Sequence, residues 1–378
     1  MKSNPLVELG RVGQSVWYDQ MERSLITEGT LRRLIEEDDL RGLTSNPTIF
    51  DKAIGSTSQY TAALHRLAEE GRSRDEIYDA LVLGDIADAA DTFRPVYDRY
   101  EGGDGYVSLE VSPLLAHDTK GTIAEASRLH GKLGRPNVMI KIPATPEGIP
   151  AIEETTANGI NVNITLIFSN HVYEEVIEAY LRGLERRAAA GEEIRNSASV
   201  ASFFVSRIDT LVDRKLDERI AATEDGAMQT RLASLRGNVA IANAKMAYQM
   251  FRQRFESERF EALRKKGARV QRPLWASTGT KNPAYSDVLY IESLIAPDTV
   301  NTVPPQTYDA FRDHGIVRVT IEEKLDEAKR VLDQLEDAGI SLDEVTEQLR
   351  RDGVDSFAKS FESLMGTIET RRQAEVVS

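Results

Sequence analysis

The alternation of short apolar segments with longer helical segments along the whole chain is the feature that most limits its possible folds. Short runs rich in Val, Ile, Leu and Phe, bounded by Gly, Pro, Ser or Asn, are typical of buried strands. The segments between them carry apolar residues at the spacing of amphipathic helices. The predicted strands, eight in number, are residues 15–18, 41–44, 106–111, 137–143, 160–166, 199–205, 273–276 and 299–303.

Strands that alternate with helices favour a parallel sheet, and eight of them match the (β/α)₈ TIM barrel. A doubly wound open sheet is the competing fold. It usually carries a nucleotide-binding signature, and the chain has neither G-x-G-x-x-G after its first strand nor G-x-x-x-x-G-K-[ST]. We therefore expect an α/β fold, a single (β/α)₈ TIM barrel domain over residues 1–378. Additional helices are expected as an insertion around 209–266 and at the C-terminus around 320–375. An apolar stripe near the C-terminus consists of Val354, Phe357, Phe361, Leu364 and Ile368.

Composition narrows the class of partner. The 378 residues include 47 Lys and Arg against 61 Asp and Glu, a formal net charge of −14, which disfavours nucleic acid and anionic membranes as partners. The absence of cysteine excludes disulfides and thiolate catalysis. Residues 1–17 lack a signal-peptide pattern, and no apolar run approaches the roughly 20 residues of a membrane span. We expect a soluble, cytoplasmic protein that is a monomer or a homodimer.

A lysine interrupts the fourth apolar strand, within the stretch Asn137–Thr145. Lys141 is flanked by apolar residues, and Pro143 ends the strand just past it. Burial disfavours the charged form of an amine, and a neutral amine is a nucleophile that forms Schiff bases with carbonyl substrates. The alternative is a lysine at a strand end that reaches water or pairs with a carboxylate.

Polar residues recur at the C-terminal ends of the predicted strands, where the active site of a barrel lies. The set contains an amine, two carboxylates, several amides and hydroxyls, and two cations on late strands, which suits carbonyl chemistry on a phosphorylated substrate. Taken singly, Asp19 could be a helix N-cap, Glu110 an ion-pair partner, and Arg207 part of a surface ion pair. The joint occurrence favours a site. Its candidates are Asp19, Thr44, Ser45, Asn46, Glu110, Lys141, Asn163, Thr165, Ser202, Arg207, Ser277, Lys281, Asn301 and Thr302.

The histidines of the chain are scattered, without H-E-x-x-H or another tight ligand spacing. A metal-dependent aldolase normally needs a histidine cluster, so the sequence favours an amine mechanism and predicts no metal site. The G-x-S-x-G signature of a serine nucleophile is also missing.

Five stretches of the chain resemble the transaldolase family in its longer bacterial form. The most specific is residues 159–169, with the sequence GINVNITLIFS. The others are GLTSNP at 42–47, SLEV at 108–111, IKIP at 140–143 and SFFVSRID at 202–209. The resemblance covers nearly the whole barrel.

This resemblance implies a (β/α)₈ barrel enzyme of the pentose phosphate pathway that needs no cofactor. The implied reaction moves a dihydroxyacetone unit from sedoheptulose 7-phosphate or fructose 6-phosphate to glyceraldehyde 3-phosphate or erythrose 4-phosphate. By position, Lys141 resembles the Schiff-base lysine, and Asp19 and Glu110 resemble the acid–base carboxylates. The residues that resemble binders of the dihydroxyacetone part, of a catalytic water or of the phosphate are Thr44, Asn46, Asn163, Thr165, Ser202, Phe204, Arg207, Ser277 and Lys281.

Two features depart from the family pattern. Many members have an arginine soon after the serine that follows the seventh strand, whereas here Ser277 is followed by Thr, Gly, Thr and Lys281. We expect the lysine to take the arginine's place, as a point charge without the bidentate geometry of a guanidinium. The second is the long segment 209–266, whose purpose does not follow from the sequence. Two alternatives stay open: a fructose 6-phosphate aldolase that releases free dihydroxyacetone, and a catalytically silent barrel that binds sugar phosphates.

Overall fold

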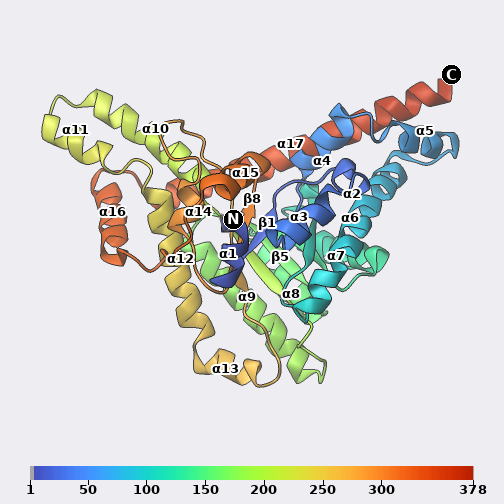
Figure 1. The fold of residues 1–378 in the computed structure, drawn as a ribbon, viewed down its shortest axis with the longest axis horizontal. Helices are drawn as coiled ribbons and strands as arrows, with labels where there is room; N and C mark the ends of the chain where they lie inside the picture. Colours follow the sequence, from blue (N-terminus) through green and yellow to red (C-terminus); the bar gives the residue numbers. More distant parts are fainter. Residues whose placement is uncertain (1–3, 378) are drawn as a thin grey trace.

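A computed structural model describes residues 4–377 of the chain, and the side chains of residues 4–374. Eight parallel strands close into a barrel in sequence order, and the last strand pairs with the first. Figure 1 shows the strands at the centre of the molecule with helices around them. The predicted (β/α)₈ barrel is confirmed. Its strands are β1 (Gln14–Tyr18), β2 (Gly42–Thr44), β3 (Tyr106–Glu110), β4 (Val138–Pro143), β5 (Val162–Ile167), β6 (Ser199–Phe204), β7 (Arg272–Ala276) and β8 (Thr299–Val303).

The largest difference from the predicted strands lies in β5, which begins two residues after the predicted start at 160. Asn161 precedes it because its amide bonds the backbones on both sides, donating to Pro136 O and accepting from Ala198 N. The polar alternation continues to Thr165 and then breaks. Leu166 has φ +58°, and the register between β5 and β6 shifts at this point, as in a β-bulge.

Helices surround the barrel and fill the segments between the strands. Those before β4 are α1 (Pro5–Arg11), α2 (Arg23–Thr27), α3 (Thr30–Asp38), α4 (Pro47–Ser56), α5 (Thr61–Glu69), α6 (Arg74–Arg99), the 3₁₀ turn η1 (Pro113–Leu115) and α7 (Thr119–Leu133). The next are α8 (Gly148–Ala157), α9 (Asn170–Ala189), α10 (Ser206–Ala222), α11 (Gly226–Ala233), α12 (Val239–Phe255) and α13 (Glu258–Arg264). The last are α14 (Leu289–Ser293), α15 (Pro305–His314), α16 (Leu325–Asp337) and α17 (Leu342–Val377).

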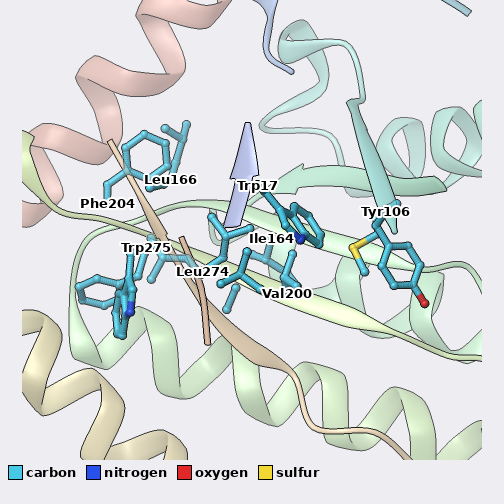
Figure 2. Close-up of a cluster of buried hydrophobic side chains, with 14 of the residues drawn as sticks. Trp17, Tyr106, Ile164, Leu166, Val200, Phe204, Leu274 and Trp275 are labelled. Atoms are coloured by element: carbon cyan, nitrogen blue, oxygen red, sulfur yellow. The ribbon is translucent and has the colours of Figure 1, made fainter. Parts of the chain in front are cut away.

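Buried apolar side chains pack within and around the barrel. Figure 2 shows the buried apolar cluster, with Trp17 and Tyr106 at one end and Leu166 and Phe204 at the other. Trp17 needs a glycine on the neighbouring strand, because a Cβ on Gly42 would lie 2.5 Å from the indole ring. Burial of this apolar surface is the main stabilising term for the barrel.

The C-terminal helix α17 packs back onto the first half of the chain. In Figure 1 it extends past α4 and α5, far from them in sequence. The Thr48 and Ser360 hydroxyls lie 2.8 Å apart, and Arg371 donates to the carbonyl oxygens of Ile54 and Gly55 at 3.1 and 3.0 Å. The arginine thereby pairs two carbonyls at the C-terminal end of α4. Within residues 4–377, no helix has both the length and the apolar character required to cross a membrane.

Candidate active site

Three neighbouring strands bring the central candidates side by side. In the register of the sheet, Glu110 on β3 is paired with Lys141 on β4, and Lys141 with Asn163 on β5. Paired residues on parallel strands point to the same face. All three side chains are buried. The local apolar pattern of each strand therefore places an acid, an amine and an amide in one row.

Lys141 is held by polar contacts and covered by an aromatic ring. Its Nζ donates to Ser45 O at 3.1 Å and lies 3.4 Å from Glu110 Oε2. The ring centroid of Phe357 on α17 is 5.8 Å from Nζ. Only 6% of the lysine side chain is exposed. The amine is thus buried in the wall and positioned by one carbonyl and one carboxylate.

Glu110 is a carboxyl that can exchange a proton near neutrality. Burial raises its pKa to about 7, although the charge of Lys141 opposes the shift. An acid–base group works best when its pKa lies near the operating pH.

A hydrogen-bonded chain of polar side chains crosses the barrel beside the lysine. Asn163 Nδ2 donates to Ser108 Oγ at 2.9 Å, and Ser202 Oγ donates to Asn163 Oδ1 at 2.7 Å. These bonds fix the orientation of the amide. Two residues along β5, the Thr165 hydroxyl is buried without a hydrogen-bond partner among the described residues. A buried unpaired hydroxyl is costly, so this one is suited to a ligand or a water molecule.

Asp19 follows β1 at the opposite side of the barrel mouth. Its Oδ1 accepts from Thr44 Oγ1 at 2.8 Å, and Thr44 Oγ1 is 2.6 Å from Thr302 Oγ1. Burial raises the pKa of Asp19, and the charges of Lys141, Arg207 and Lys281 oppose that shift. The carboxylate therefore lies within the electrostatic reach of the amine and of both predicted phosphate-binding cations.

A cavity of about 380 Å³ opens at the C-terminal ends of the strands. Three of its lining cations, Lys52, Arg207 and Lys281, make no ion pair or hydrogen bond to the described residues. The Arg207 guanidinium stacks on Phe204 at 5.1 Å, and burial lowers its pKa. A chain with a net charge of −14 thus places unpaired positive charge at one cavity, as an anionic substrate requires.

The loop after β7 is shaped by an unusual backbone conformation. Ser277 has φ +55°, in the left-handed region that non-glycine residues seldom adopt. Its carbonyl accepts from Ser206 N at 3.1 Å, and the two hydroxyls are 3.0 Å apart. Strained residues of this kind persist where the surroundings hold them, commonly at functional sites. The contact ties the Lys281 loop to the start of the Arg207 helix, α10.

Comparison with known proteins identifies the family. The family model described as Transaldolase/Fructose-6-phosphate aldolase matches residues 16–368. A transaldolase of Trichodesmium erythraeum is 48% identical over 373 residues, which cover 98% of each chain. A transaldolase of Saccharopolyspora erythraea is 47% identical over 370 residues, 97% of this chain and 98% of the relative. The chain belongs to the transaldolase/fructose-6-phosphate aldolase family.

Membership of the transaldolase family confirms the resemblance predicted from the sequence motifs and shows that the chain is an enzyme of this type. A third relative, a transaldolase of Thermobifida fusca, is 47% identical over 366 residues, 97% of each chain. Because these alignments span almost the full length of the chains, the long segment between β6 and β7 lies within the region compared. Among residues 4–377, no group of three or more His, Asp or Glu residues is placed to hold a metal ion.

In this transaldolase-family barrel, the predicted residues divide between the cavity surface and the wall behind it. Glu110, Asn163 and Thr165 lie in the wall, next to or beyond the lysine. Ser45 takes part through its carbonyl. Asn301 is turned aside, and its Oδ1 accepts from Thr278 at 2.8 Å. The predicted residues that line the cavity are Asp19, Thr44, Asn46, Lys141, Ser202, Phe204, Arg207, Ser277, Lys281 and Thr302. Their individual roles stay predictions.

Sequence reasoning missed several residues that line the cavity, among them Gln20, Lys52 and Phe357. The sequence contains a pattern from which the position of Lys52 at the site could have been predicted. Asn46 caps α4 by accepting from Ile49 N, and Lys52 follows one helical turn after Ile49 on the same face. No pattern in the sequence could have predicted Phe357 as a site residue, because it belongs to an apolar stripe that predicts only a buried helix face.

Proposed function

We propose that the chain is a transaldolase of the pentose phosphate pathway. It transfers a dihydroxyacetone unit from sedoheptulose 7-phosphate or fructose 6-phosphate to glyceraldehyde 3-phosphate or erythrose 4-phosphate, through a Schiff base on Lys141. One observation carries this proposal: a buried amine, 3.4 Å from a carboxyl with a pKa of about 7, lies in the wall of a cavity lined by unpaired cations.

In the first step, Lys141 Nζ adds to the C2 carbonyl of the ketose phosphate, and water leaves to form an iminium ion. Glu110 protonates the departing hydroxyl and later accepts a proton from the hydrolytic water. Its raised pKa lets it do both near neutrality. The unpaired Thr165 hydroxyl, on the strand next to the lysine, holds that water.

In the second step, the iminium ion draws electrons from the C3–C4 bond. Asp19 accepts the proton of the C4 hydroxyl, the bond breaks, and the aldose phosphate leaves. A dihydroxyacetone enamine remains on Lys141. The hydrogen bond from Thr44 orients the aspartate for this transfer. General acid–base catalysis of this kind contributes about 10²–10⁴-fold.

In the third step, the enamine carbon attacks the aldehyde of the acceptor, and Asp19 returns its proton to the new hydroxyl. Water then hydrolyses the iminium ion, and the ketose product leaves. Arg207 and Lys281 bind the phosphate of donor and acceptor in turn, because both are unpaired cations in the cavity wall. Asn163, oriented by Ser108 and Ser202, binds a hydroxyl of the dihydroxyacetone part.

Borohydride reduction in the presence of fructose 6-phosphate tests the proposal. Reduction traps the Schiff base, and peptide mapping locates it. We expect a dihydroxyacetone adduct on Lys141 and loss of turnover to below detection in Lys141→Met, which retains the side-chain volume without the amine. Lys245 is an internal control, because it is also buried but its Nζ donates to the carbonyls of Thr320 and Glu323.

An adduct on Lys245, or no adduct in folded protein, would contradict the proposal. Free dihydroxyacetone as the main product would favour the aldolase alternative, and binding of fructose 6-phosphate without an adduct would favour the silent barrel. Neither alternative has support in the names of the three relatives, all of which are transaldolases.

We also propose that residues 1–378 act as one barrel domain, as a monomer or homodimer in the cytoplasm, where the phosphorylated sugars of this pathway are converted. The contacts of α17 with α4, α5 and α6 support a single domain, because they join the C-terminal helices to the first half of the barrel. Sedimentation equilibrium at assay concentration measures the oligomeric state.

A further inference from the structure

Helix α17 places an aromatic ring directly at the reactive lysine. Phe357 lies near the middle of this helix, lines the cavity, and is only 3% exposed. Its ring centroid is 5.8 Å from Lys141 Nζ. The contact comes from a helix and not from a strand of the barrel, and the phenylalanine is more than 200 residues away from the lysine in the sequence. The cover over the amine therefore depends on where α17 docks.

Helix α17 packs against β5, the strand next to the one that carries the lysine. A Cβ on Gly353, one turn before Phe357, would lie 2.8 Å from Leu166 Cδ2. Leu166 itself has the left-handed backbone conformation, with φ +58°, at the register shift of β5. In Figure 2 Leu166 and Phe204 lie together at the end of the apolar cluster. The leucine thus fits into a notch that only glycine leaves on the helix.

Two further contacts hold the helix on the far side of Phe357. The Thr48 and Ser360 hydroxyls join α17 to α4 at 2.8 Å. Phe361 packs edge-on against Tyr78 of α6, with ring centroids 5.4 Å apart. The helix is therefore fixed to β5 before Phe357 and to α4 and α6 after it, so the ring is held in place over the amine.

The enamine on the lysine has two fates. In transfer, its nucleophilic carbon forms a bond to the aldehyde carbon of the acceptor, and the aldehyde oxygen takes a proton. In release, the same carbon takes a proton from water, which gives an iminium ion. A second water then adds to C2, the C–N bond breaks, and free dihydroxyacetone leaves with the amine restored. The choice depends on whether water or the aldehyde reaches the carbon first.

We infer that Phe357 is the positioning residue that keeps solvent water from the enamine on Lys141 and so favours transfer over release. This inference rests on the proposed Schiff-base function. An apolar ring at the amine denies water its hydrogen-bonding partners, while an acceptor held by its phosphate can still approach along the cavity. In the proposed mechanism, Thr165 holds the hydrolytic water needed for product release and Glu110 accepts its proton, within the barrel wall.

The test compares Phe357→Leu, Phe357→Val and Phe357→Ala with the wild type. Fructose 6-phosphate and erythrose 4-phosphate are supplied together, and the ratio of free dihydroxyacetone to sedoheptulose 7-phosphate is measured. We expect the ratio to rise as the side chain shrinks, by about tenfold or more for alanine and less than about threefold for leucine. If the alanine variant does not fold, the ratios of the valine and leucine variants are compared instead, and the inference requires a higher ratio for valine.

Phe361→Ala is the matched control, because it removes the same ring from the same helix, one turn away and outside the cavity. It should raise the ratio far less than Phe357→Ala, because the Thr48–Ser360 and Gly353–Leu166 contacts still hold the helix and the ring of Phe357 is still present. Gly353→Ala should raise the ratio with Phe357 intact, because it moves the helix away from Leu166.

An unchanged ratio across the Phe357 series, with the borohydride adduct still formed on Lys141, overturns the inference. An equal rise in Phe361→Ala also overturns it, because the effect would then be a general loosening of α17. Absence of the adduct in the wild type is a different result, since it refutes the Schiff-base function itself.

Discussion

The two ends of the barrel both carry cavities lined with charged residues, but they differ in how those charges are paired. At the C-terminal end, Lys52, Arg207 and Lys281 line the cavity without ion pairs or hydrogen bonds to the described residues. At the N-terminal end, a cavity of about 280 Å³ is lined by Arg41, Asp104, Arg269 and Arg272, among others.

At the N-terminal end each of these charges is satisfied. Asp104 accepts from Ser15 Oγ and, at 2.9 Å, from Trp17 Nε1, and Arg272 Nη2 lies 3.2 Å from its Oδ1. Arg41 pairs with Asp39 at 2.5 Å. Arg269 donates to the carbonyl oxygens of Arg195 and Glu101. These groups hold strand starts and loops together, and none is left to bind a ligand.

The comparison teaches that unpaired charge, rather than charge or concavity alone, distinguishes the functional end of this barrel. A buried pair contributes to structure and becomes costly only when one partner is removed. An unpaired cation at a cavity already bears part of its desolvation cost, which an anionic substrate offsets when it binds. Substitutions at the two ends should therefore separate stability from substrate affinity.

The largest expected effect on stability is that of Arg272→Gln. It leaves Asp104 buried without its charged partner, so we expect the free energy of unfolding to fall by about 3–5 kcal/mol. Urea unfolding measures the change. The KM and kcat of the folded variant should stay at the wild-type values, because Arg272 is at the opposite end of the barrel.

Adding Asp104→Asn to Arg272→Gln should recover part of the lost stability, since the unpaired carboxylate is then removed. A double variant as unstable as the sum of the two single variants would show that the pair is not coupled, and the comparison between the two ends would fail.

Arg207→Gln should have the converse effect. We expect the KM for fructose 6-phosphate to rise by about 10–10²-fold, with kcat changed far less, because the arginine binds the phosphate in the ground state and the transition state alike. Stability should be unchanged or slightly higher, because burial already opposes the charge of this residue. Steady-state kinetics and urea unfolding of the same preparation measure both.

Binding of inorganic phosphate tests the role of Arg207 without a measurement of turnover. It should raise the melting temperature of the wild type and of Arg272→Gln, and have a smaller effect on Arg207→Gln. Equal stabilisation of all three proteins would show that phosphate binds elsewhere.

The smallest expected effect is the pH dependence of Glu110→Gln. The folded pKa of Glu110 is about 7 against an ordinary value of 4.5, so the folded state binds more protons between these pH values. The contribution of Glu110 to the free energy of unfolding is complete below about pH 4.5 and is lost as the pH rises through 7. The stability of the variant relative to the wild type should therefore increase from pH 5 to pH 8, by about 1–3 kcal/mol.

Urea unfolding at several pH values measures this difference, and Asp104→Asn serves as a comparison at the other end of the barrel. A difference between Glu110→Gln and the wild type that stays constant from pH 5 to pH 8 would contradict the raised pKa.

The strands and the central row of the site could be predicted because their signals are local. A short apolar run encodes a strand buried on both faces, and β8 was predicted with its observed bounds, 299–303. Once eight strands are counted, the polar residue at each strand end must face one common site. Lys141 and Glu110 are adjacent for this reason, and their neighbouring strands have the register that the alternation implies.

Other properties could not be predicted because they depend on contacts between distant segments. The sequence does not distinguish a charged residue at the start of a strand from one at its end. The pairing of Arg272 with Asp104 therefore follows only from the structure, in which β7 and the β2–β3 connection meet. The unpaired state of Arg207 is likewise a property of its surroundings. Lys52 lines the cavity only because the capped start of α4 turns that face toward the barrel.

By itself the sequence determined the (β/α)₈ fold, the row of acid, amine and amide, and the family, since all of these follow from residue patterns within single strands and their ends. The tertiary structure alone decided which charges are paired and what covers the lysine. Phe357 belongs to a stripe that any buried helix would show. Its position over Lys141 results from the fit of Leu166 into the notch at Gly353, a contact of shape between segments almost 190 residues apart.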